Sequence, residues 1–322
     1  MVEMHIKNFV KRENCIIGVC DAAPLTIDVT GFTPFVSRDS LKRTDPAANL
    51  PGAKSIIVAG VPYVNKNFPP VPEGAGILSV LGVAGDYHIV VKTLLKKLVA
   101  ELQLHTNFMY KILVDSPTLD ERALAVRAGL GFIGRSGLVI SPEYGSRFNI
   151  GLLLTDIDMP SSPVNIKALS EARQSTEPGL LRSYNPRNDG EGGYGAAHNK
   201  LPVATCSPDC SSCISACPTR ALSESVGYDV TRCISYLTQK DNLTPDESTL
   251  IGRHLYGCDI CQDACPHNIQ QPTAWANPKD WLSMNDDDFA NTYGRTAMLW
   301  RGTALLRRNA KAVIDNVKQF IK

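Results

Sequence analysis

The order of apolar and polar positions predicts alternating strands and helices over the first half of this chain. Apolar, β-branched runs bounded by turn residues indicate strands at 15–20 and 54–63. From residue 87 to 103 apolar side chains recur at helical spacing, with lysines on the opposite face, which predicts an amphipathic helix. The same criteria predict the remaining elements of this half, a strand at 110–116, a helix at 119–129 and strands at 137–145 and 147–159. This order predicts an α/β or α+β domain over residues 1–157.

The second half has a different pattern. Residues 158–205 are rich in Gly, Asn, Pro and Ser and have little periodicity, so we expect an inserted loop or linker there. A cysteine-rich segment follows at 206–270. Residues 271–322 have helical spacing that is interrupted at Gly294 and Gly302, which predicts a short helical C-terminal tail.

Composition narrows the class of protein. With 322 residues, of which 43% are hydrophobic, the chain can bury one substantial core or two smaller ones. It has no signal-peptide pattern at its N-terminus and no run of eighteen apolar residues, so we expect a cytoplasmic monomer with no membrane segment. The net charge of +1 argues against a generally basic nucleic-acid surface. Seven Lys or Arg accompany the single Asp315 between residues 295 and 322, an excess that fits either phosphate binding or the solvated face of a helix.

The cysteines carry the strongest chemical signal. Because disulfides are rare in a reducing cytoplasm, closely spaced thiols there are more often metal ligands or redox groups. Eight of the ten cysteines lie between residues 206 and 265, and they are Cys206, Cys210, Cys213, Cys217, Cys233, Cys258, Cys261 and Cys265. The other two, Cys15 and Cys20, flank an apolar stretch, where buried thiols behave as small hydrophobic groups.

The spacing of the eight cysteines favours iron–sulfur clusters over zinc. A zinc site closes with two Cys-x-x-Cys pairs, whereas "CSSCISACP" and "CDICQDACP" both have the Cys-x2-Cys-x3-Cys-Pro ending of bacterial ferredoxins. In those ferredoxins the last cysteine of each run binds the other cluster. We therefore predict two [4Fe–4S] clusters, one bound by Cys206, Cys210, Cys213 and Cys265 and the other by Cys258, Cys261, Cys217 and Cys233.

Two of these ligands depart from the ferredoxin spacing. Three residues, not two, separate Cys206 from Cys210. The second run lacks its own first cysteine, which Cys233 must supply from a segment that we predict to be a short helix.

The segment "GLGFIG", with Gly129, Gly131 and Gly134, matches the G-x-G-x-x-G pattern of dinucleotide-binding proteins. That pattern requires a strand before the glycines and a helix after them, so that the phosphates meet the helix N-terminus. Here the predicted order is reversed, which argues against a nicotinamide or flavin site. Tight turns, close backbone approach to a ligand, or a helix end at Gly131 remain as explanations.

Five segments together resemble the epoxyqueuosine reductase family, cobalamin-dependent tRNA-modification enzymes related to reductive dehalogenases. These segments are "FVSRDSLKRTDPAANLPGAKSIIV", "GDYH", "VDSPTLDERALAVRAGLGFIGRSGLVISPEYGS", "RCISYLTQ" and "YGCDICQDACPHN". The resemblance covers about residues 10–157 and 206–310, and the block at 115–147 is specific.

The resemblance implies a fold and an activity. It implies an N-terminal α/β (α+β) corrinoid-binding domain, a ferredoxin-like double [4Fe–4S] domain and a short helical C-terminus. The implied cofactors are a base-off cobalamin and two clusters that pass electrons to cobalt, and an external low-potential donor must supply those electrons. The implied partner and substrate is tRNA, whose epoxyqueuosine at the wobble position is reduced to queuosine with loss of water.

The resemblance also assigns residues. The general acid of the family falls in "VDS", which places this role on Asp115, with a corrinoid contact at the same residue. Further corrinoid contacts fall on Arg43, before "LPG", and on Val139, Ser141 and Ile150. Next to the expected acid, Asp120 and Glu121 begin a predicted helix, where carboxylates stabilise the N-terminus.

The chain departs from the family in two places that concern substrate recognition. About 48 residues, 158–205, separate the two domains where family members have a short linker, and the helical repeats that extend the family C-terminus toward tRNA are mostly absent. Two alternatives therefore stay open. One is a related corrinoid reductase with a different substrate, and the other is a two-cluster electron carrier without catalytic activity.

Overall fold

The computed structural model describes residues 2–27, 35–64, 68–164, 206–224 and 227–320, and nearly all of the linker expected at 158–205 lies outside them. The chain forms two compact units. The first comprises Met1–Pro62 and Val91–Cys210, and the second comprises Tyr63–Val90 and Ser211–Lys322. The domain boundaries expected from the sequence stay a prediction, because residues 63–90 group here with the C-terminal half of the chain.

A five-stranded antiparallel sheet forms the centre of the first unit. Its strands, in spatial order, are β4 (Tyr110–Val114), β7 (Phe148–Thr155), β2 (Ser55–Pro62), β1 (Ile16–Asp21) and β8 (Ser162–Val164). Every pairing within this sheet is antiparallel. The strands predicted at 15–20, 54–63, 110–116 and 147–159 are confirmed, and their pairing favours the α+β alternative over a parallel α/β sheet.

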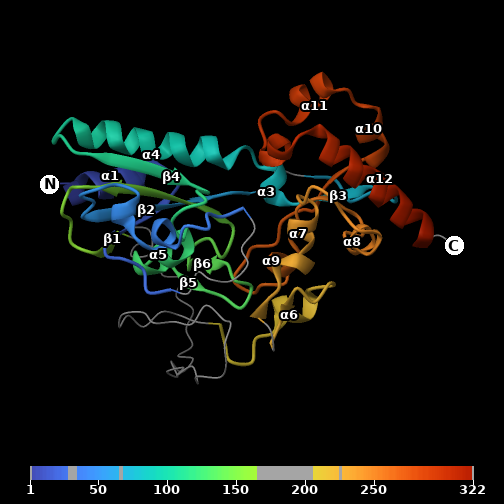
Figure 1. Cartoon of the computed structure of the whole chain (residues 1–322), viewed down its shortest axis with the longest axis horizontal. Coiled ribbons are helices and arrows are strands. Elements are labelled where there is room, and N and C mark those ends of the chain that lie inside the picture. Colours follow the sequence, from blue (N-terminus) through green and yellow to red (C-terminus); the bar gives the residue numbers. More distant parts are fainter. Residues whose placement is uncertain (1, 28–34, 65–67, 165–205, 225–226, 321–322) are drawn as a thin grey trace. The chain divides into compact units, whose positions relative to one another are not determined.

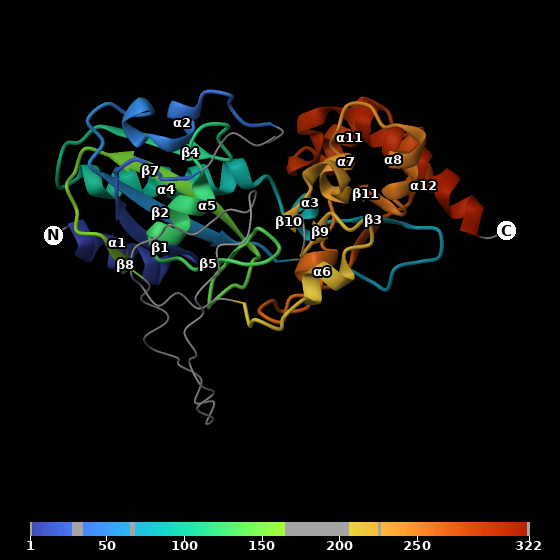
Figure 2. The same cartoon turned by 60° about the horizontal axis from the view of Figure 1, so that its bottom comes forward.

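Helices cover both faces of this sheet (Figures 1 and 2). Because side chains alternate along a strand, Ile57 and Ala59 of β2 join one core while Ile56 and Val58 join the other. The first core is completed by α1 (Val2–Arg12) and by the part of α4 (Tyr87–Gln103) from Val91 onward. The second core is completed by α5 (Glu121–Arg127). Helix α4 and helix α5 were predicted, whereas α1 was not.

Short elements join these layers. They are α2 (Ser40–Thr44), a 3-10 turn at Pro46–Ala48, and the hairpin of β5 (Phe132–Ile133) with β6 (Val139–Ile140). The strand predicted at 137–145 is therefore much shorter than expected. Its continuation is a single bridge between Ser141 and Gly145, which closes a tight turn.

The second unit packs helices around a three-stranded sheet. Strand β3 (Gly76–Leu78) pairs parallel with β11 (His254–Tyr256) and antiparallel with β12 (Ala274–Ala276). The core includes Trp281 and Phe289, which meet edge to face, and it receives Leu306 and Val313 from the last helix. The helices around it are α3 (Val80–Val83), α8 (Pro245–Leu250), α10 (Pro278–Ser283), α11 (Asp286–Tyr293) and α12 (Thr303–Phe320).

The predicted helical tail is confirmed in its position and in its interruptions. Helix α11 ends at Gly294, a 3-10 turn spans Ala297–Arg301, and Gly302 at φ 83° separates this turn from α12. A φ in this range favours glycine, which explains the break. Among the described helices, none is long and apolar enough to cross a membrane.

The two-sided burial of the central sheet makes a stability prediction. Leu152 on β7 is fully buried, so Leu152→Ala should lower the free energy of unfolding of the first unit by about 2–5 kcal/mol. The control is Leu104→Ala, because the Leu104 side chain is 80% exposed and should contribute almost nothing. Chemical denaturation of both variants tests this, and equal stability of the two would contradict the assigned core.

Candidate active site and cluster-binding segment

Asp115 follows the last residue of β4, at one end of the sheet. The pairing of β4 with β7 ends at Val114, opposite Gly151, so Asp115 and Ile150 each lie one residue beyond this last pair, at the same end of the sheet. Asp115 is exposed, and its φ of 47° lies in the left-handed region, which aspartate tolerates better than most residues. The expected acid and one expected corrinoid contact, the half-buried Ile150, are thus brought together by strand pairing.

Arg43 is tied to the loop that follows Asp115. Arg43 lies in α2 and is only 6% exposed, and its carbonyl accepts the Asp120 N–H at 3.3 Å. In addition, the Ser37 N–H donates to the Pro117 carbonyl at 2.6 Å. The segment before α2 and the loop after β4 therefore hold each other in place.

Val139 and Ser141 are more deeply buried than a ligand contact requires. Val139 is 4% and Ser141 is 1% exposed. The Ser141 N–H donates to the Gly145 carbonyl at 2.8 Å, and the Ser141 hydroxyl accepts the Glu143 N–H at 3.1 Å. Val139 belongs to the core that α5 covers, and Ile150 packs against the same core.

The sequence did not identify Glu121 as a functional residue. In the structure its carboxyl has a different hydrogen-bond partner from that of its neighbour Asp120. Asp120 caps α5 as expected, because its carboxylate accepts the Ala123 N–H at 3.0 Å. Glu121 turns toward the loop, where its Oε1 accepts the Ser116 N–H at 3.2 Å. Burial raises the pKa of Glu121 to about 8 against the opposing effect of that hydrogen bond, and the negative charges of Asp115 and Asp120 add to the rise. Only the tertiary burial of this carboxyl distinguishes it, and no sequence pattern reports that.

The glycine segment lies between a helix and a hairpin, as predicted, and is not a dinucleotide loop. Gly129, not Gly131, follows the end of α5 with a positive φ of 77°. A Cβ on Gly131 would lie 2.1 Å from the Ile140 carbonyl oxygen, so only glycine fits against β6. A Cβ on Gly134 would lie 3.5 Å from the sulfur of Cys206, and Arg135 donates to the Pro208 carbonyl at 2.6 Å. The segment therefore packs the hairpin and the start of the cysteine-rich region.

Several of the expected cluster ligands gather in the second unit. Helix α6 (Ser212–Ala216) carries Cys213 and is followed by Cys217. It contacts α9 (Ile260–Asp263), which carries Cys261. Cys233 directly precedes α7 (Ile234–Leu237). Burial raises the pKa of Cys261 to about 12, and the charges of Cys233, Cys213, Asp259 and Cys217 contribute, so each of these groups lies near Cys261. The pKa of Cys258 is raised by burial, then by Cys261 and Cys233. Cys206 and Cys210 belong to the first unit.

Cys217 has the environment of a thiolate ligand. Burial by itself raises its pKa, but backbone N–H groups of Leu222, Ala221 and Thr219 and the Thr219 hydroxyl point at the sulfur, and the net effect lowers the pKa. Thiolates, not thiols, bind metals, so these donors favour the ligating form. Within the described residues, no three His, Cys, Asp or Glu side chains form a site for a single metal ion.

Asp259, between Cys258 and Cys261, fixes the position of the second cysteine run. Its carboxylate accepts the Val80 N–H at the start of α3 and also the Gln262 side-chain amide at 3.0 Å. The Gly257 N–H donates to the Thr238 hydroxyl at 2.9 Å. The hydrogen bonds to Val80 and to Thr238 hold Asp259 and Gly257, the two neighbours of Cys258, to other parts of the second unit.

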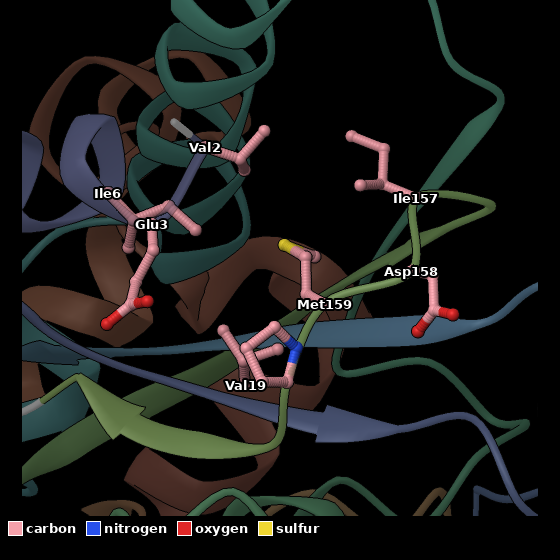
Figure 3. A pocket seen from close by; sticks show the side chains of 8 residues that line it. Val2, Glu3, Ile6, Val19, Ile157, Asp158 and Met159 are labelled. Carbon is pink, nitrogen blue, oxygen red and sulfur yellow. The ribbon is translucent and has the colours of Figure 1, made fainter.

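A pocket in the first unit lies apart from these residues (Figure 3). It has a volume of about 280 Å³ and is lined by α1, β1 and the segment after β7. Its lining is mostly apolar, with the carboxylates of Glu3 and Asp158. None of the residues expected at the active site lines it.

Two family matches cover the regions that carry the site. The epoxyqueuosine reductase QueG family, DUF1730, matches residues 43–116, from Arg43 to the residue after Asp115. The 4Fe-4S double cluster binding domain matches residues 206–268, which contain all eight clustered cysteines.

Curated relatives align over most of the chain. An epoxyqueuosine reductase of Bacillus cereus is 31% identical in an alignment of 303 residues that covers 88% of this chain and 70% of the relative. The enzyme of Bacillus subtilis is 30% identical over 88% of this chain and 68% of its own length. The enzyme of Escherichia coli is 31% identical over 74% of this chain and 55% of its own length.

Solved structures of the same enzyme share the fold. Epoxyqueuosine reductase crystallised with an epoxyqueuosine-modified tRNA-Tyr stem loop superposes with a TM-score of 0.79 at 26% identity, over 98% of this chain and 81% of that one. The Streptococcus thermophilus enzyme gives 0.75 at 30% identity over the same shares. A Bacillus subtilis structure, in which a catalytic aspartate loop is swung out of the active site, gives 0.78 at 26% identity, again over 98% and 81%.

The shifted pKa of Glu121 makes the stability of the chain depend on pH. Its pKa is about 8 in the fold and near 4.5 in the unfolded chain, so the fold binds more protons between these values. Stability should therefore fall as pH rises from about 4.5 through 8. In denaturation from pH 5 to 9, the stability of Glu121→Gln relative to the parent should increase as the pH rises. The increase should correspond to roughly tenfold or more in the folding equilibrium constant. The exposed Glu73→Gln should show no such gain, and parallel curves for parent and Glu121→Gln would disprove the shift.

Proposed function

Because this chain belongs to the epoxyqueuosine reductase family, we propose that it reduces the epoxide of epoxyqueuosine in tRNA to the alkene of queuosine. The reaction consumes two electrons and two protons, and the epoxide oxygen leaves as water. The single observation that carries the proposal is the alignment of relatives with this activity over 88% of the chain, including the approximately 200 residues before the cysteines. The enzyme is an oxidoreductase of this family.

We propose that the eight clustered cysteines bind the two [4Fe–4S] clusters in the two sets expected from the sequence. The proximity of Cys258 to Cys261 and Cys233 and of Cys261 to Cys233 and Cys217 supports the second set, and Cys213 of the first set also lies near Cys261. The N–H groups that point at Cys217 fit a thiolate that binds iron.

We propose that a corrinoid binds beside Asp115, with contacts from Arg43, Val139, Ser141 and Ile150. When bound, it supplies a cobalt centre that collects electrons from the clusters and acts as a nucleophile. The exposed Asp115 and the half-buried Ile150 stand together at one end of the sheet and combine a polar group with apolar surface, which fits a large amphipathic ring. Val139 and Ser141 are so buried that they support the site from behind.

We propose that Asp115 protonates the epoxide oxygen. It stands exposed on a loop held by Pro117 and Asp120, so its carboxyl is open to a substrate. The Bacillus subtilis relative has a catalytic aspartate loop, which supports the same role for this loop here. Proton donation by a positioned carboxyl contributes about 10²- to 10⁴-fold to the rate of such reactions.

The arginines of the C-terminal region are less available to RNA than their number suggests. Arg301 pairs with Asp241, Arg307 with Asp286, and Arg308 donates to the carbonyls of Lys240 and Asp241. These contacts hold α12 and the turn before it to the rest of the second unit. The tRNA partner is therefore proposed from the family, and a related corrinoid reductase with another substrate is the remaining alternative.

Metal analysis of the anaerobically reconstituted chain tests the cofactors. We expect about eight irons and one cobalt per chain after reconstitution with iron, sulfide and cobalamin and removal of free metal. Cys261→Ser should lose about four irons, because it removes a ligand of one cluster only. The buried Cys15→Ser should retain all eight, and a full complement of iron in Cys261→Ser would contradict the assignment.

Substitution of the proposed acid tests the reaction. Asp115→Asn should retain iron and cobalt while losing about 10²-fold or more in conversion of epoxyqueuosine in tRNA, measured by nucleoside analysis. The exposed Asp246→Asn on α8 should keep full activity. Undiminished turnover by Asp115→Asn would exclude Asp115 as the acid, and no turnover by the parent chain would exclude the substrate.

A further inference from the structure

We infer that Glu121 is a positioning residue, whose carboxyl holds the loop that carries Asp115 in the conformation from which Asp115 reaches the substrate. The inference rests on the proposed function, in which Asp115 is the acid. None of the family matches or relatives assigns a role to Glu121.

The loop between β4 and α5 begins with an unfavourable backbone conformation. Asp115 has a φ of 47°, which side chains other than glycine adopt at a cost. A residue in this region persists only when the surrounding structure holds it there. The contacts of the loop therefore decide whether Asp115 keeps its orientation.

Glu121 provides the contact closest to Asp115. Its Oε1 accepts the Ser116 N–H at 3.2 Å, and this N–H belongs to the peptide unit that joins Asp115 to Ser116. Fixing the plane of that peptide fixes ψ of Asp115, and with it the direction of the Asp115 side chain. The backbone of Asp115 itself also hydrogen-bonds to the Glu121 carboxyl. Farther along the loop, Ser116 Oγ meets Thr118 Oγ1 at 2.7 Å and the Pro117 carbonyl accepts the Ser37 N–H.

The charges around Glu121 favour a neutral carboxyl at this position. Asp115 and Asp120 are the charged groups that act on it, and Arg122 is occupied by Asp120 at 3.8 Å and by the Gly137 carbonyl at 3.0 Å. Burial together with these two negative neighbours raises the pKa of Glu121 to about 8, so the group is protonated at neutral pH. A neutral carboxyl still accepts the Ser116 N–H through its carbonyl oxygen.

If the loop between β4 and α5 depends on the hydrogen bond from Ser116 to Glu121, it should move when this bond is lost. The catalytic aspartate loop of the Bacillus subtilis relative has been seen swung out of the active site. In this chain the side chain at the start of α5 is the group that secures the corresponding peptide. We therefore expect loss of the Glu121 acceptor to free the loop without disturbing the clusters.

The test compares two substitutions of similar volume in the reconstituted enzyme. Glu121→Gln keeps an oxygen that can accept the Ser116 N–H, whereas Glu121→Met removes it. We expect Glu121→Gln to keep kcat within about threefold and Glu121→Met to lose about thirtyfold or more, with KM for epoxyqueuosine-containing tRNA little changed and iron and cobalt retained. The exposed Glu73→Met is the control and should keep parental activity.

Two readouts separate positioning from a general structural effect. Hydrogen exchange at the Ser116 amide should accelerate in Glu121→Met and stay protected in Glu121→Gln, in the presence or absence of substrate. The parent should also show an inflection near pH 8 in its kcat profile, where Glu121 gains charge beside Asp115, and Glu121→Gln should lack it.

Three results would overturn the inference. Full activity with unchanged exchange in Glu121→Met would mean that the carboxyl holds nothing. Equal inactivation of both variants would mean that the proton of Glu121, not its acceptor oxygen, is required. If the parent itself fails to reduce epoxyqueuosine in tRNA, the proposed function is wrong. Hydrogen exchange still tests the inference in that case, because unaccelerated exchange at Ser116 in Glu121→Met would show that Glu121 does not position the loop.

Discussion

The pairing of β4 with β7 is the constraint on which the site depends. Strand β7 lies between β4 and β2, and its middle residues are buried on both faces, so a slip of one residue against β4 would turn the β4 side chains to the opposite faces of the sheet. That register places Asp115 and Ile150 at the same end of the sheet. Because the sheet is antiparallel, the acid is not positioned by the carboxyl-end rule of parallel α/β sheets. The proposed acid is instead placed by one strand pair and a short loop, in which Glu121 accepts the Ser116 N–H and Leu119 packs into the core.

The cysteine-rich segment depends on a different kind of interaction. Its helices α6, α7 and α9 are about one turn long. Hydrogen bonds help to hold these helices in position. Asp259 accepts the Val80 N–H, Gly257 donates to Thr238, and donors surround Cys217. A segment held this way keeps its sulfurs in place while leaving them partly accessible for clusters.

The sequence predicts local features of this chain well and long-range features poorly. Helix α4 and strands β1, β2, β4 and β7 were predicted because the pattern of apolar residues is visible in their own sequences. The duplicated Cys-Pro endings likewise indicate a double cluster domain from the sequence alone. The order of strands in the sheet depends on pairings between distant residues, so it could not be predicted from periodicity. The same limit applies to Glu121, whose burial depends on a loop and a helix that pack together, and to residues 63–90, whose strand β3 pairs with β11.

The segment from Asp115 to Gly134 links the two halves of the proposed chemistry within one unit. It begins at the proposed acid, continues through Glu121 and α5, turns at Gly129 and ends at Gly134, where a Cβ would lie 3.5 Å from the Cys206 sulfur. Helix α5 is packed into the core through Leu124, so its two ends cannot move independently. Gly131 and Gly134 of the segment that mimics a dinucleotide motif have a packing role, because a Cβ would lie 2.1 Å from the Ile140 carbonyl oxygen at Gly131 and 2.4 Å from Ile140 Cδ1 at Gly134. The proposed acid thus precedes α5, and an expected cluster ligand lies near Gly134, which follows α5 in the same unit.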